Sequence, residues 1–186
     1  MSARVVGLGH FGFYVKDLEK MVHFYRDFMG MTLTKVNDRM AFFSTDPNAV
    51  DHEIALMAGR ESLDDPHLID QISLRVETLD DLRDFHRRLK AENYQIDRLV
   101  THASAIGCYF RDPEGNRTEV FWVTGLPSWA NISVPIDIDR PDDEVMADVN
   151  RVWEQVRHIG IGEKPDAETG AKIRELSSGG VGAATR

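Results

Sequence analysis

The first two-thirds of the chain contain one pattern twice. Residues 10–15 alternate between apolar and polar or small side chains, and a helical stripe of apolar residues follows them. The same order returns at residues 71–76 and in the stretch after them. Strand-like alternation and helix-like spacing in this order predict two βαβββ modules in tandem, over about residues 5–60 and 67–124.

Residue types that bind metals occupy equivalent places in the two modules. The repeat aligns His10 with Gln71 at the start of each module. An Asp-Pro pair stands at the same distance before Glu53 as before Glu119, so the ends of the modules also correspond. Imidazole, amide and carboxylate groups all bind divalent metals. The repeat therefore predicts one metal site where the two modules meet.

Strand alternation indicates which face of the sheet carries that site. Leu74 must face a helix, so Gln71 and Ser73 face the other way. The same argument places Glu119 and Phe121 opposite the helix side of the last strand. We expect one apolar face covered by helices and a second face that carries polar groups. Polar groups withdrawn from water need partners. A sheet face that carries such groups is therefore typical of a binding site.

Composition excludes several classes of protein. The chain has 186 residues and a formal net charge of −9, which argues against a nucleic-acid or anionic-membrane partner. No apolar run approaches the length of a membrane span. The single cysteine, Cys108, cannot form an internal disulfide, which favours a cytoplasmic location.

We expect one domain over residues 1–125 and an extension over residues 126–186. In the extension an apolar stripe indicates one helix near residues 142–156. The tail after it, which includes Ser177, Ser178, Gly179 and Gly180, is predicted to be disordered. The extension is interpreted as a lid, a dimer contact or both.

Three motifs resemble the vicinal oxygen chelate superfamily, which includes glyoxalase I, bleomycin-resistance proteins and extradiol dioxygenases. They are residues 9–15, residues 24–27, and residues 109–116 together with Glu119. The resemblance covers about residues 5–124. It implies an α+β fold in which the tandem modules form a cup-shaped mixed sheet, with the helical extension after it. It also implies that His10 and Glu119 are metal ligands, with Gln71 at the place of a third.

The chain is most similar to the single-domain extradiol dioxygenases, which cleave catechol-like rings with Fe(II) and O2. Gln71 departs from that branch, which has a second histidine there. The resemblance implies an acid–base role for His52, a hydrogen bond from Tyr109 to the substrate and a nearby role for His102. Candidate substrate contacts are Tyr14, Phe43, Arg75 and Phe121.

Two other interpretations remain open at this stage. A glyoxalase-like lyase or isomerase would use Ni, Zn or Mn and add Glu53 as a fourth ligand. Strand alternation supports this second interpretation, because it places His52 on the helix side of the sheet. Only a β-bulge would turn His52 toward the metal. A non-catalytic binding protein for small molecules is the third interpretation. The superfamily and the amphipathic helix also lead us to expect a homodimer.

Overall fold

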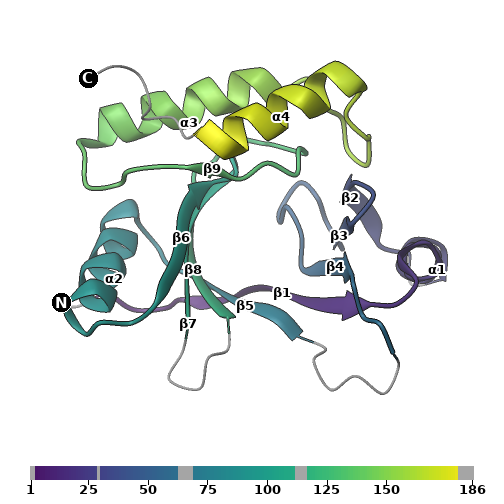
Figure 1. Cartoon of the computed structure of the whole chain (residues 1–186), viewed down its shortest axis with the longest axis horizontal. Coiled ribbons are helices and arrows are strands. Elements are labelled where there is room, and N and C mark those ends of the chain that lie inside the picture. Colours follow the sequence, from purple (N-terminus) through teal and green to yellow (C-terminus); the bar gives the residue numbers. More distant parts are fainter. Residues whose placement is uncertain (1–2, 29, 63–68, 112–116, 180–186) are drawn as a thin grey trace.

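The computed structural model describes residues 3–28, 30–62, 69–111 and 117–179 (Figure 1). Its described strands form one mixed sheet of nine strands in the order β2-β3-β4-β1-β5-β8-β7-β6-β9. The Asp-Pro stretch at residues 112–116, which carries part of the family resemblance, lies outside the described residues.

The first module has the predicted order of one strand, one helix and three strands. Asp17 caps the helix by accepting a hydrogen bond of 2.9 Å from the backbone N–H of Lys20. Gly30, at φ 73°, follows the helical stretch, where a left-handed residue is typical. The elements are β1 (Gly7–Val15), α1 (Leu18–His23), the π-helical turn η1 (Phe24–Phe28), β2 (Thr32–Val36), β3 (Met40–Ser44) and β4 (Ile54–Ala58).

The second module repeats that order, so the prediction of tandem βαβββ modules is confirmed. Its helix begins with the predicted capping box, in which Thr78 and Asp81 each accept a hydrogen bond from the backbone N–H of the other. The elements are β5 (Ile69–Arg75), α2 (Leu79–Ala91), β6 (Ile96–Thr101), β7 (Ala105–Arg111) and β8 (Arg117–Val123).

The two modules meet along the centre of the sheet. Strand β1 pairs antiparallel with β5, and β5 pairs parallel with β8. The register sets His10 opposite Ser73 and Ser73 opposite Glu119. These three side chains therefore form one row across three adjacent strands.

Helices α1 and α2 lie outside the two arms of the curved sheet, and the concave face is left for the site (Figure 1). The expected helix-covered face is therefore only partly present, because Phe11 of β1 and Ile72 of β5 are each 39% exposed. The helix α1 packs on a core that includes Phe43 and Leu56. The helix α2 packs on a second core that includes Leu82 and Val120. Burial of these apolar side chains is the main force that holds each helix on the sheet.

The extension crosses from one rim of the cup to the other. It contains β9 (Val134–Pro135), α3 (Asp142–Val156) and α4 (Ala167–Gly179). Strand β9 pairs with β6 at one rim. At the other rim the Gly162 N–H donates a 2.8 Å hydrogen bond to the Thr34 carbonyl, and Lys164 pairs with Asp38 at 2.9 Å. The extension thus covers the open side of the sheet (Figure 1).

One prediction about the extension is wrong. The helix at residues 142–156 is present as expected, but residues 167–179 form α4 instead of a disordered tail. Two apolar side chains of α4, Ile173 and Leu176, pack against the core under α3. This tertiary contact stabilises a segment whose composition alone does not indicate a helix. Gly180 lies outside the described residues. Among the described helices, none is long and apolar enough to cross a membrane.

Candidate metal and substrate site

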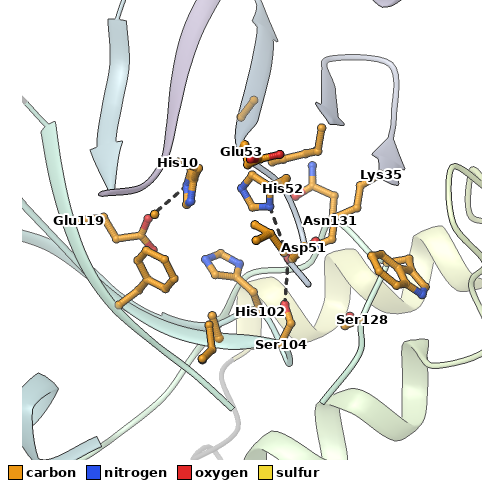
Figure 2. Close-up of a pocket in the computed structure, with 18 of the residues that line it drawn as sticks. His10, Lys35, Asp51, His52, Glu53, His102, Ser104, Glu119, Ser128 and Asn131 are labelled. Carbon is orange, nitrogen blue, oxygen red and sulfur yellow. Dashed lines mark hydrogen bonds and ion pairs between the residues drawn. The ribbon is translucent and has the colours of Figure 1, made fainter. Parts of the chain in front are cut away.

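The concave face of the sheet encloses a cavity of about 870 Å3. Strands of both modules form its walls, and residues 126–133 of the extension complete it. Figure 2 shows the polar side chains around it, with His10 and Glu119 on one side of His52 and Lys35, Asn131 and Ser128 on the other. The cavity is large enough for a small-molecule ligand.

The predicted ligand types converge at the centre of the cup. Nε2 of His10 lies 3.6 Å from Oε2 of Glu119. Nε2 of Gln71 lies 3.2 Å from Nε2 of His10 and 3.3 Å from Oε2 of Glu119. The Ser73 hydroxyl lies within the group, 2.8 Å from His10 and 2.6 Å from Glu119. The sequence pointed to Ser73 only as a residue on this face.

The Glu119 carboxylate is buried without an ion pair to any Lys or Arg among the described residues. Glu119 is 2% exposed, and burial raises its pKa, although the hydrogen bond from Ser73 and the charge of Arg98 oppose the shift. Burial also lowers the pKa of His10 well below its usual value, so His10 is neutral at pH 7. No described Lys or Arg forms an ion pair with Glu119. A metal ion at the carboxylate would favour the ionised form of Glu119 further.

A divalent metal ion fits this donor set. Ligands at about 2.1 Å from a metal stand roughly 3 Å apart, close to the spacings among His10, Gln71 and Glu119. The oxygen and nitrogen of the Gln71 amide exchange places by a flip of the group, so its oxygen can take the position given above for Nε2. Among the described residues no three His, Cys, Asp or Glu side chains form a metal-binding group, because the third donor here is an amide.

Two glycines make room for these side chains. A Cβ on Gly107 would lie 2.2 Å from Oε1 of Glu119. A Cβ on Gly9 would lie 2.3 Å from the ring of Phe121, which in turn lies 5.5 Å from the His10 ring between centroids. Any side chain at either position would displace a group of the site.

His52, not Glu53, faces the metal-ligand candidates. The His52 ring centroid lies 4.2 Å from that of His10, whereas Oε2 of Glu53 accepts 2.7 Å hydrogen bonds from the N–H and hydroxyl of Thr45. The alternation argument that placed His52 on the helix side is wrong, because β4 begins only at Ile54. Residue 52 lies in the preceding loop, where the alternation of a strand does not apply.

His102 and Tyr109 form a hydrogen-bonded pair in the wall of the cavity. The Ile132 carbonyl accepts a 2.6 Å hydrogen bond from Nδ1 of His102, which leaves Nε2 to accept from the Tyr109 hydroxyl at 2.9 Å. Burial lowers the pKa of His102 to about 4 and raises the pKa of Tyr109 well above 10. The histidine is therefore neutral and the tyrosine protonated at pH 7.

Two of the four candidate substrate contacts line the cavity, and two do not. Phe121 and Arg75 line the cavity. Phe43 does not, because it is fully buried in the core beneath α1; its neighbour Phe42 has the opposite strand parity and lines the cavity. The prediction that Tyr14 lines the cavity is also wrong. Its hydroxyl instead donates a 2.5 Å hydrogen bond to Asp70 at the strand end.

Sequence reasoning missed the buried ion pair in the cavity wall. Nζ of Lys35 lies 2.7 Å from Oδ2 of Asp51, and the Lys35 side chain is 5% exposed. Oδ2 of Asp51 also lies 3.4 Å from Nδ1 of His52. A shift in the β2–β3 register between Leu33 and Lys35 turns Lys35 inward. Nothing in the alternation pattern of the sequence indicates such a bulge.

Comparison with known proteins agrees with the fold. A model of the Glyoxalase/Bleomycin resistance protein/Dioxygenase superfamily matches residues 7–120. The chain therefore belongs to this superfamily. A comparison with curated protein sequences finds no match.

Solved structures with a similar fold include both kinds of enzyme. The Mn(II)-bound glyoxalase from Novosphingobium aromaticivorans shares 22% identity at a TM-score of 0.56, over 64% of this chain and 40% of that one. Homoprotocatechuate 2,3-dioxygenase from Brevibacterium fuscum, in a complex with 3,4-dihydroxyphenylacetate, shares 18% identity at a TM-score of 0.56. That match covers 66% of this chain and 38% of that one. The chain thus spans less than half the length of either.

Proposed function

We propose that the protein is a metal-dependent extradiol-type dioxygenase that acts on a catechol-like aromatic. The observation that carries this proposal is the position of His52, whose ring centroid lies 4.2 Å from that of His10. Glu53 also lines the cavity, but its carboxylate is hydrogen-bonded to Thr45. A glyoxalase-like site with four protein ligands needs Glu53 at the metal. The arrangement therefore supports a site with three protein ligands and a free histidine beside them.

In this proposal His10, Gln71 and Glu119 hold the metal. Divalent iron would supply open coordination positions where the catechol and O2 meet. Fe(II) is our preferred metal, and the amide ligand also suits Mn, Ni or Zn.

The remaining side chains position the substrate and handle its protons. His52 would accept a phenolic proton, because its ring faces the ligand group and Asp51 lies on its Nδ1 side. The Tyr109 hydroxyl, which donates its proton to His102, would accept a hydrogen bond from a substrate hydroxyl. Phe121 and Phe42 line the cavity and provide apolar contacts for a flat ring.

Oxygen uptake tests this proposal. The full chain, purified without oxygen and loaded with Fe(II), should consume one O2 for each catechol and give a ring-cleaved product. His10→Ala should abolish uptake, because it removes a ligand. Conversion of a hemithioacetal without O2 uptake would contradict the dioxygenase and favour the glyoxalase-like lyase. Tight binding of an aromatic with no metal and no turnover would favour the binding protein. The homodimer and the cytoplasmic location remain predictions.

A further inference from the structure

The cavity has a second polar region on the far side of His52 from Glu119 (Figure 2). It is lined by Lys35, Asp51, Ser104, Ser128 and Asn131, and we call these five residues the distal recess. Its members come from the first module, the second module and the extension. None of them belongs to the group of metal-ligand candidates.

The chain places a charged pair in this recess at a cost. Lys35 and its predecessor Thr34 are both buried, although neighbouring residues of a regular strand face opposite ways. The β-bulge before Lys35 produces this arrangement and aims its ammonium at Asp51. Withdrawal of an ion pair from water costs free energy, and such pairs often mark functional sites.

Two polar atoms of the recess have no hydrogen-bond partner among the described residues. They are Oδ1 of Asp51 and Oγ of Ser128, and both atoms are buried. Ser128 is 2% exposed, yet it borders the cavity. A buried polar atom without a partner costs about 1–3 kcal/mol. A ligand group that reaches these atoms after a rotation of their side chains would recover this energy.

The chemistry of the two atoms defines the ligand group. Asp51 Oδ1 accepts a hydrogen bond, and the Ser128 hydroxyl can donate one. The charges of Lys35 and Asp51 offset each other, so the pair adds no net charge to attract an ionic group. A hydroxyl donates and accepts at the same atom, whereas a carboxylate offers Asp51 no proton.

We infer that the distal recess binds an uncharged hydroxyl substituent of the substrate. The inference rests on the proposed function for the presence of an aromatic ring at the metal. It adds the class of substrate, which is a catechol with a hydroxyalkyl side chain. Ser128 and Asp51 then determine specificity without taking part in ring cleavage.

Anaerobic calorimetry on the iron-loaded full chain tests the inference. The probes are 3- and 4-methylcatechol, the two matching hydroxymethylcatechols, 3,4-dihydroxybenzoate and catechol itself. One hydroxymethyl isomer should bind about tenfold more tightly than its methyl partner, as expected for two new hydrogen bonds. Ser128→Ala should reduce this ratio to about threefold or less. Ser178→Ala, on the exposed side of α4, should leave the ratio unchanged.

The affinity ratios measured on the wild-type protein test the inference even if a variant does not fold. Equal binding of both hydroxymethyl and methyl pairs overturns the inference. So does tightest binding of the benzoate, which would place the substituent beside a cation such as Arg98 of the cavity wall. Turnover of the same probes separates the two proposals. Cleavage of catechol with no hydroxyl preference removes only the inference, whereas a hydroxyl preference without cleavage removes only the dioxygenase. Failure of every catechol to bind overturns both.

Discussion

The imidazole rings of His10 and His52 lie 4.2 Å apart between centroids, although the two residues come from different parts of the first module. His10 is on strand β1, and His52 is in the loop before β4. Parallel pairing of β1 with β4 brings that loop beside His10, with Phe11 opposite Ile54. One histidine is thereby available as a ligand and the other as a base.

This relationship predicts an order of effects for two neighbouring substitutions. His52→Ala should lower kcat by about 100-fold or more, because it removes the proposed acid–base group. Glu53→Gln should change kcat by less than about threefold, since its carboxylate bonds only to Thr45 among the described residues. Steady-state oxygen uptake with a catechol measures both. The reverse order would support Glu53 as a metal ligand instead.

Gly107 offers a test of the Glu119 position. Gly107→Ala places a methyl group where Oε1 of Glu119 now lies, so the carboxylate must move away from the ligand group. We expect metal affinity to fall about tenfold or more, as measured by competition with a chelator. Gly7→Ala is the matched control, because a Cβ there meets nothing within 4 Å. Equal affinities of the two variants would show that Glu119 does not bind the metal.

The buried His102 predicts a loss of stability in acid. Its pKa of about 4 in the folded chain lies below the usual 6.5, so the unfolded chain binds the proton more readily. This contribution is complete above pH 6.5 and falls as the pH drops toward 4, by about 3 kcal/mol in total. Urea unfolding at several pH values should show a smaller fall for His102→Gln. Parallel curves for the two proteins would contradict the assignment.

Gly162 anchors the extension to the rim of the first module. It adopts a φ of 71°, and a Cβ would lie 2.8 Å from the Leu33 carbonyl oxygen. Gly162→Ala should therefore reduce the free energy of unfolding by about 1–3 kcal/mol. Gly179→Ala, with open space around its Cα, should have little effect. If chemical denaturation finds the two variants equally stable, the contact at Gly162 does not hold the extension in place.

Periodicity predicted much of this fold because the modules obey regular patterns. The repeat gave both βαβββ units, and strand parity gave the face shared by His10, Gln71 and Glu119. Parity failed where the chain is irregular. His52 precedes its strand, and Lys35 follows a bulge, so neither orientation can be obtained from alternation. Ser128 reaches the cavity only through the path of the extension, which depends on tertiary packing.

Metal content tests the central claim most directly. The full chain should be purified without oxygen, loaded with Fe(II), desalted and analysed for elements, beside His10→Ala and the surface control His23→Ala. We predict close to one iron per chain for the wild type and for His23→Ala, whose side chain is 73% exposed. His10→Ala should retain little. Equal metal content in all three proteins, or none in any of them after loading, would contradict a metal site at His10, Gln71 and Glu119.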